Sequence, residues 1–364
     1  MQNVQVPDIE RLDYTPGPVS DGRADWRARD VDNMEGWSYV LGADEINTLG
    51  QALDQARAAG VDIDELSQDN FPLPSMQPLF ERLLNELETG RGLFLLRGFP
   101  VDRYSKDDLR YMYVGLCKHL GVLRPQSSGG DYLGDVRNFN IDINSDRGRA
   151  YTSRQRLTFH SDQADVVGLL VLRTAKSGGL SKLASAVAIR NELARTRPDL
   201  LEALHQPLYW SWQKEQPPGE LGWYQQPIYT EWQGRFSSYY IRTHINSAQR
   251  YEEIPRLTEQ QIAAMDAIDE LANSEEFHFS TMFQPGDLQF LNNHVILHSR
   301  TEFEDYEEPD RRRHLLRIWL SVKNSRPLHP VMSPLFKDQS PGAARGGYVP
   351  RDSRRVYETS VSVT

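Results

Sequence analysis

The stretch "GDLQFLNNHVILHSRTEFEDYEEPDRRRHLLRIWLSV", residues 286–322, has two apolar runs of β-forming residues on either side of an acidic turn. If the second run is a strand, alternate side chains point to opposite faces. One face then carries Arg311, Arg313, Leu315, Arg317 and Trp319. The other face is apolar apart from His314, which we expect to be a core histidine with a hydrogen-bond partner. The apolar face predicts a buried sheet. The arginine-bearing face is typical of a cavity wall that binds an anion, although an edge strand with solvated arginines is the alternative.

Further short runs of β-forming residues lie upstream of this stretch and are separated by Gly, Pro, Asn and Asp. They span residues 135–143, 165–174, 227–232 and 235–245. Such spacing is typical of an all-β sandwich or barrel rather than alternating strands and helices. One helix is expected within this region, at residues 257–277, where Thr258 and Gln261 form a capping box. Its inward face is predicted to carry Ile262, Met265, Ile268 and Leu271.

The N-terminal part of the chain has helical rather than strand periodicity. Helices are predicted at residues 43–60, 78–90 and 105–121, with a buried strand at 92–100. We therefore expect a mainly β domain with flanking helices over residues 43–324, including a lid-like insert around 205–260. An arm at residues 1–42 precedes this domain. A C-terminal tail at 325–364, rich in Pro, Gly and Arg, is expected to wrap the surface.

Charge and composition exclude several classes of partner. The net charge of −10 argues against a nucleic-acid or anionic-membrane binder, and no apolar run is long enough to span a bilayer. A single cysteine, Cys117, excludes an internal disulfide and a cysteine-rich zinc module, so any metal must use His, Asp or Glu. We expect a cytoplasmic protein with a small-molecule substrate, and the sequence is compatible with a homo-oligomer.

A histidine and an aspartate two residues apart, His160 and Asp162, lie just before the apolar run at 165–174. On a strand, side chains two apart share a face, so both can lean toward one ion. His298 follows the first apolar run of the opening stretch and supplies a second imidazole. Two histidines and one carboxylate that leave open positions are the ligand set of non-haem Fe(II) oxygenases. A chance pair of surface residues is the alternative for an isolated His-x-Asp.

The order "FHSD" (159–162), "SGGLSKLAS" (177–185), "NNHVILHSR" (292–300) and "RRRHLLRIWL" (311–320) resembles the taurine dioxygenase (TauD/TfdA-type) family over roughly residues 90–322. The resemblance implies a double-stranded β-helix, or jelly roll, of the clavaminate synthase type. It also implies Fe(II), 2-oxoglutarate and O₂ as cofactor and co-substrates. By position, His160, Asp162 and His298 match the catalytic iron ligands. Arg313 matches the arginine that holds 2-oxoglutarate, and Arg317 matches one that faces an anionic substrate.

Two departures from the family pattern stand out. The chain has "GGLSK" where the family has Gly-Gly-Asp-Thr, which leaves Ser181 as the expected co-substrate contact. His294 precedes His298 by four residues and is a rival ligand, a substrate contact or a packed histidine. Weaker substrate contacts are expected from Asn138, Asn140 and Arg242.

The predicted reaction couples oxidative decarboxylation of 2-oxoglutarate, giving succinate and CO₂, with hydroxylation or a related C–H oxidation. The substrate is expected to be small and anionic or amino-acid-like. Two alternatives remain open at this point. One is a cupin-type metalloenzyme that does not use 2-oxoglutarate. The other is a non-enzymatic jelly roll that binds a small molecule.

Overall fold

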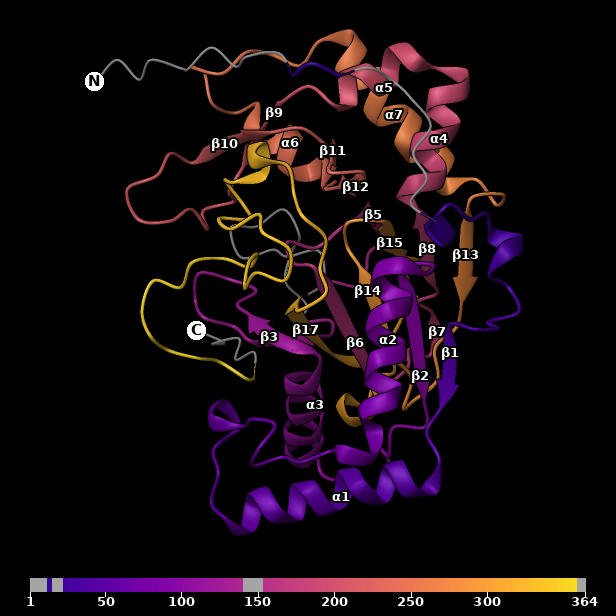
Figure 1. Ribbon diagram of the computed structural model, residues 1–364, viewed down its shortest axis with the longest axis vertical. Helices are drawn as coiled ribbons and strands as arrows, with labels where there is room; N and C mark the ends of the chain where they lie inside the picture. The colour runs from indigo at the N-terminus through magenta and orange to yellow at the C-terminus, as the bar shows by residue number, and fades with distance from the viewer. Residues whose placement is uncertain (1–11, 15–21, 140–152, 359–364) are drawn as a thin grey trace.

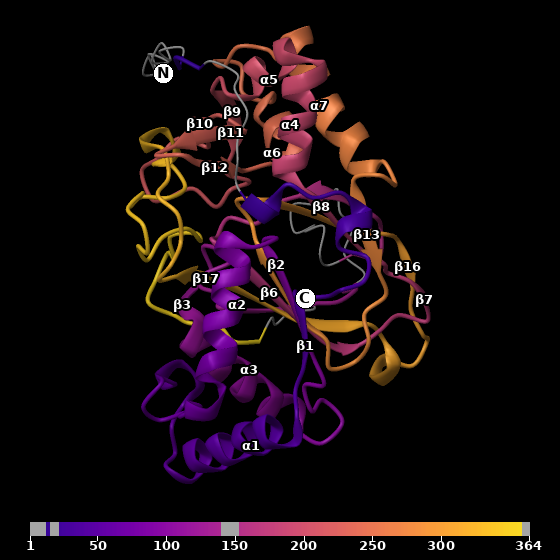
Figure 2. The same ribbon diagram turned by 45° about the vertical axis from the view of Figure 1, so that its right-hand side comes forward.

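The computed structural model describes residues 12–14, 22–139 and 153–358. Two β-sheets make up its middle, with helices packed at both ends (Figures 1 and 2). This is the double-stranded β-helix with flanking helices that the sequence predicts. Within the described ranges, no helix combines the length and the apolar character that crossing a membrane requires.

The larger sheet has seven strands, and its centre is the antiparallel pair formed by β6 and β17. In spatial order its strands are β1 (Ser38–Val40), β2 (Leu93–Arg97), β14 (Leu288–Asn292), β6 (Val166–Arg173), β17 (His314–Val322) and β3 (Gly121–Arg124), with β4 (Leu133–Val136) also paired to β17. Every residue of β17 is buried, in accord with the predicted burial of that strand.

The smaller sheet has four antiparallel strands in the order β13 (His278–Thr281), β8 (Ser181–Ser185), β15 (Ile296–Arg300) and β5 (Leu157–His160). Its register places His298 of β15 directly opposite His160 of β5. Three two-stranded ribbons complete the strands: β9 (Leu208–Ser211) with β10 (Trp223–Gln226), β11 (Tyr229–Trp232) with β12 (Arg235–Ser238), and β7 (Ser177–Gly178) with β16 (Phe303–Glu304).

Two groups of helices cover the sheets. The first comprises α1 (Ala43–Ala58), α2 (Gln77–Thr89) and α3 (Lys106–Leu120), which lie in the lower half of Figure 2. Ser105 caps α3 by accepting a hydrogen bond from the main-chain N–H of Asp108, as predicted. The second group contains α4 (Ala186–Thr196), α5 (Pro198–Leu204), α6 (Arg242–Ala248) and α7 (Glu259–Asn273). The capping box of Thr258 and Gln261 at the start of α7 is confirmed.

The apolar run of β2 shows why the larger sheet is buried on both faces. Leu93 and Leu95 pack into the core between the sheets and the second helix group. Phe94 and Leu96 point the other way, into the core beneath α1, α2 and α3. Because successive strand residues alternate between faces, a strand between two cores must be apolar throughout. The sheet is therefore held from both sides, and its central strand β17 carries Arg317, which is discussed below.

Several local predictions are wrong. The run at 286–297 is two strands, β14 and β15, because a turn at 293–295 divides it. Residues 242–248 form α6 rather than the end of a strand. Ile262 of α7 is 39% exposed, since Ala264 and Ala272 share the inner face with Met265 and Ile268. Helices α4 and α5 were not predicted.

The described segments outside the expected domain pack against it. In the described part of the N-terminal arm, Trp26 and Trp37 are buried anchors, and β1 joins the larger sheet beside β2. In the C-terminal tail, Arg345 is only 1% exposed, although the composition of the tail predicted a surface wrap.

Candidate active site

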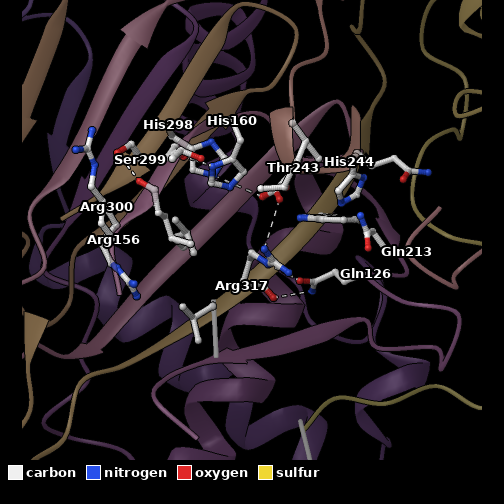
Figure 3. A pocket seen from close by; sticks show the side chains of 18 of the residues that line it. Gln126, Arg156, His160, Gln213, Thr243, His244, His298, Ser299, Arg300 and Arg317 are labelled. Atoms are coloured by element: carbon white, nitrogen blue, oxygen red, sulfur yellow. Dashed lines mark hydrogen bonds and ion pairs between the residues drawn. The ribbon is translucent and has the colours of Figure 1, made fainter. Parts of the chain in front are cut away.

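Three side chains that are distant in sequence converge where β5 and β15 pair. His160 is the last residue of β5, Asp162 follows in the loop, and His298 lies on β15. The two imidazole rings are 4.3 Å apart between centroids, and Nε2 of His298 is 3.8 Å from Oδ2 of Asp162 (Figure 3). One ligand atom from each residue lies within 4.8 Å of the other two. Asp162 is beyond the end of the strand, so the loop rather than strand alternation brings it to the histidines.

The donor atoms of this cluster fit a metal ion. Nδ1 of His160 is 2.8 Å from the main-chain oxygen of Thr158, which leaves Nε2 for a metal. Oδ2 of Asp162 is buried with no hydrogen-bond partner, an arrangement that costs free energy unless a cation is nearby. Two imidazoles and one carboxylate form a ligand set suited to Fe(II).

Electrostatics favour the forms of Asp162 and His298 that can bind a metal. Burial favours the neutral acid, but the charges of Arg317, His298 and His160 hold the pKa of Asp162 below its usual value. Burial, together with the neighbouring His160, lowers the pKa of His298 to about 3. The carboxylate is therefore ionised and the His298 imidazole is neutral at physiological pH.

The cluster opens into a cavity of about 720 Å³. In the view of Figure 3, Arg156, Ser299 and Arg300 lie to one side of the His160–His298 pair. Gln126, Gln213, Thr243, His244 and Arg317 lie to the other side. The cluster of His160, Asp162 and His298 thus separates two ends of one cavity, which are described below as the arginine end and the lid end.

The arginine end contains two buried guanidinium groups, those of Arg313 and Arg300. Among the described residues, neither has a carboxylate within ion-pair distance. Nη1 of Arg313 and both Nε and Nη1 of Arg300 are buried without a hydrogen-bond partner. Burial and the charge on Arg300 lower the pKa of Arg313 to about 9, and burial lowers that of Arg300 to about 10. An anionic group bound here would relieve this electrostatic cost.

Arg300 was missed in the sequence, although a signal for it was present. It follows His298 by two residues on β15, so both side chains point to the same face. Ser181 lies on β8 directly opposite Arg300 and also lines the arginine end. Ser181 is therefore part of the cavity wall next to Arg300, and its contact with the co-substrate stays a prediction.

Arg317 lies between the cluster of His160, Asp162 and His298 and the lid end. Its Nε donates to Oε1 of Gln126 over 2.7 Å, and its Nη1 is 3.4 Å from Oδ1 of Asp162. Gln126 in turn donates its side-chain N–H to the main-chain oxygen of Arg317. This reciprocal pair fixes a positive charge beside the carboxylate of Asp162 and at the wall of the cavity.

The lid end is built by the segment predicted as a lid. Gln213 and Lys214, at the turn after β9, both have positive φ angles of 54° and 67°. Two successive non-glycine residues in this conformation are strained, and such strain is frequent at binding sites. Thr243, His244 and Ser247 project from α6 into the same end. No sequence signal singled out these five residues, because their placement depends on how the insert folds back over the sheet.

The remaining predicted substrate contacts lie elsewhere. His294 is on the turn before β15, is 1% exposed, and is 2.9 Å from Oδ1 of Asp165. The turn reverses the direction that strand alternation predicted for it, so His294 faces the core and not the cavity. Arg242 points to α7, where it forms ion pairs with Asp266 and Asp269. A contact between Arg242 and substrate is therefore not supported.

Neither predicted asparagine contact is found in the described cavity wall. Asn138 is not part of the cavity wall. Asn140 falls outside the described residues. His314 faces away from the cavity and bonds to Asp135 over 2.6 Å, as predicted for a core histidine with a partner.

We predict that the metal-free protein loses stability as the pH falls from 7.5 to 5.5. Burial lowers the pKa of several histidines below 6.5: His205, His278, His294, His298, His314 and His329. The unfolded chain therefore binds more protons below pH 6.5 than the folded chain, and stability present above that pH is lost as pH falls. Each such histidine contributes at most about 1.4 kcal/mol per pH unit. Urea unfolding at both pH values measures the change, and an unchanged free energy of unfolding would contradict the assignment of neutral buried imidazoles.

Comparison with known proteins places this site in a family. The chain is 31% identical over 315 residues to FR-33289 synthase of Streptomyces rubellomurinus, covering 85% of this chain and 92% of that protein. It is 28% identical to the taurine hydroxylase-like protein SAT17 of Stachybotrys chartarum, over 83% and 79% of the two chains.

The solved structure of asparagine oxygenase (AsnO) superposes with a TM-score of 0.60 at 16% identity, over 85% of this chain and all of that one. The non-heme iron oxygenase OrfP in complex with Fe and alpha-ketoglutaric acid gives a TM-score of 0.58 at 16% identity, over 78% and 93% of the chains. Residues 56–319 match the sequence model of the taurine catabolism dioxygenase TauD, TfdA family. The chain therefore belongs to this family and is an enzyme of its iron(II)- and 2-oxoglutarate-dependent dioxygenase class.

Proposed function

We propose that His160, Asp162 and His298 hold the iron(II) and that the arginine end holds 2-oxoglutarate. The observation that carries this proposal is the position of the metal-binding cluster beside two buried guanidinium groups that lack a carboxylate partner. The distal carboxylate of 2-oxoglutarate would lie against Arg313, with Arg300 as a second donor and Ser181 beside them. Arginine suits this task because its planar fork grips a carboxylate with two hydrogen bonds.

The side chains of the cluster are oriented by their neighbours. Thr158 fixes the His160 ring through Nδ1, and Arg317 sets one oxygen of Asp162. Three protein ligands leave part of the metal's coordination sphere for co-substrates. When bound, iron(II) with 2-oxoglutarate and O₂ supplies the oxidising chemistry, giving succinate and CO₂ as substrate is hydroxylated. The chain's part is to hold the substrate C–H close to the metal and, through the lid end, to keep water out.

We propose that the substrate is a small anion bound at the lid end. At the lid end the cavity wall carries three cationic residues, Lys214, Arg250 and Arg317, in a chain whose net charge is −10. Among the described wall residues, Asp162 is the only acidic one. Arg250 is at the lid end, where its guanidinium bonds to the hydroxyls of Ser211 and Tyr251. Such a wall favours carboxylates, sulfonates and phosphonates.

Amino acids are the second candidate class. Related folds are known in complex with 3-hydroxyasparagine, for asparagine oxygenase, and with (3S)-hydroxy-L-Arg, for OrfP. An amino-acid substrate, however, carries an ammonium group that requires an acceptor. Because Asp162 belongs to the proposed metal site, the described wall offers no second carboxylate for this ammonium. The charge of the wall therefore favours an anion without an amino group.

A screen that measures succinate formation tests this function. Compounds are compared in matched sets that share a carbon skeleton: an anionic compound, its neutral amide or ester, and its α-amino derivative. We expect the anionic member to raise succinate formation well above the uncoupled background and the neutral member to leave it unchanged. Preferential stimulation by neutral compounds would contradict an anionic substrate, and stimulation by the amino derivatives alone would favour the amino-acid class.

A further inference from the structure

The C-terminal segment at residues 345–348 packs against the loop of residues 162–165, which contains Asp162. It is beyond residues 56–319, the part of the chain that matches the family. Arg345 is 1% exposed, and Tyr348 reaches the cavity wall, where its ring stacks near that of Trp319 with centroids 6.1 Å apart. A segment with the composition of a surface tail thus supplies one of the most buried charges in the protein.

Each of the three nitrogens of the Arg345 guanidinium donates a hydrogen bond. Its Nε donates to Oδ1 of Asp165 over 2.9 Å, and its Nη1 and Nη2 donate to the main-chain oxygens of Ser340 and Arg326. His294 bonds to the same Asp165 oxygen from the other side. Burial alone would raise the pKa of Asp165, but the bonds from His294 and Arg345 hold it below the usual value. Asp165 is therefore an ionised anchor, only three residues after Asp162.

The glycines that follow Arg345 bring the main chain against the same loop. The N–H of Gly347 donates to the oxygen of Gln163 over 2.6 Å, and the Gln163 side chain donates back to the oxygen of Gly347 over 3.0 Å. Gly346 has a φ of 73°, and a Cβ atom there would come within 2.8 Å of the oxygen of Gln163. Only glycine fits this close approach without displacing the loop.

The loop is fixed from its other side by Asn293. The side-chain oxygen of Asn293 accepts the N–H of Asp162 over 2.9 Å, and its amide donates to the oxygen of Ala164 over 3.0 Å. Residues 162–165 are thus clamped between the turn before β15 and the C-terminal segment. The Asp162 carboxylate has no strand of its own to orient it, because β5 ends at His160.

We propose that Arg345 is a positioning residue for the iron ligand Asp162. It acts by holding the loop of residues 162–165, which Asn293 holds from the other side. The inference rests on the proposed function, since it assumes that Asp162 binds the metal. Partners that orient metal ligands commonly change metal affinity about 10- to 100-fold when they are removed. The C-terminal segment would then be part of the active site in this enzyme, although it contributes no metal ligand.

The test compares Arg345→Gln with Arg326→Gln in the full-length protein. Arg326 is a matched control, because it is a buried arginine of the C-terminal tail whose guanidinium pairs with Glu88. Fe(II) affinity is measured without O₂ by equilibrium dialysis, and thermal unfolding of the metal-free proteins is measured in parallel. We expect Arg345→Gln to weaken Fe(II) binding about 10- to 100-fold, with little change in Arg326→Gln even if both lose thermal stability.

A third variant, Arg345→Lys, keeps a positive charge next to Asp165 and should restore most of the Fe(II) affinity. If Arg345→Gln does not fold, Asp165→Asn replaces it in the comparison, because this change removes the carboxylate charge to which Arg345 bonds. Fe(II) affinity equal to that of the wild type in Arg345→Gln, or in Asp165→Asn where it stands in, would overturn the positioning role. Absence of Fe(II) binding by the wild type would instead overturn the proposed metal site itself.

Discussion

Replacing His160 with alanine should lower 2-oxoglutarate turnover by at least about 1,000-fold, because catalytic groups that act as a unit fail together when one is removed. His160 is only partly buried at the end of β5, and within the described residues its ring has one hydrogen-bond contact, with the main-chain oxygen of Thr158. The fold should therefore survive the substitution. Succinate formation with saturating Fe(II) and 2-oxoglutarate measures the loss, and circular dichroism checks the fold.

His119→Ala is the control for this prediction. His119 is a half-buried histidine on α3 whose Nε2 is 2.8 Å from the main-chain oxygen of Phe71, far from the cavity wall. Its removal should leave turnover nearly unchanged. A His160→Ala protein that retains a tenth or more of wild-type turnover would show that this imidazole is not an iron ligand.

Replacing Arg313 with alanine should weaken 2-oxoglutarate binding by about 2–5 kcal/mol, the usual cost of truncating one partner of a buried charge pair. That range corresponds to roughly 30-fold to several-thousand-fold in Kd. The reason is that Arg313 is 7% exposed and has no carboxylate partner among the described residues. Anaerobic titration of the Fe(II) protein with 2-oxoglutarate measures the change, and Km for 2-oxoglutarate should rise in parallel.

The neighbouring Arg312 provides the control, because its guanidinium donates to the main-chain oxygens of Tyr306 and Glu307 rather than facing the cavity. Arg312→Ala should bind 2-oxoglutarate normally. Arg300→Ala should have an effect between the two, since Nη2 of Arg300 is already held by main-chain oxygens of residues 153 and 155. An unchanged Kd in Arg313→Ala would assign the co-substrate carboxylate to a different cation.

The sequence predicted those parts of the fold that depend on local pattern. The alternation of strand β17 was predicted from His314 onward, because alternation along one strand decides both its burial and the face that carries Leu315, Arg317 and Trp319. Arg313 lies one residue before the strand and still lines the cavity, whereas the prediction for Arg311 is wrong, because Arg311 ends a short 3-10 helix and is exposed. The caps of α3 and α7 were also predicted, since capping is a local hydrogen-bonding preference. The convergence of His160, Asp162 and His298 was expected from the family resemblance and the ligand chemistry of these residue types.

What the sequence did not predict depends on contacts between distant segments. His294 seemed to share a face with His298 only because the turn at 293–295 was not recognised. Arg242 seemed available for an anion until α7 placed Asp266 and Asp269 beside it. The burial of Arg345 likewise depends on tertiary contacts with Asp165 that composition cannot predict.

A crystal structure of the protein grown without O₂ in the presence of Fe(II) and 2-oxoglutarate is the most direct test of the central claim. The account predicts one ion in contact with His160, Asp162 and His298, no fourth protein ligand, and a 2-oxoglutarate carboxylate against Arg313. An ion bound elsewhere, a fourth protein ligand that closes the site, or a His298 ring turned away from the other two ligands would contradict it.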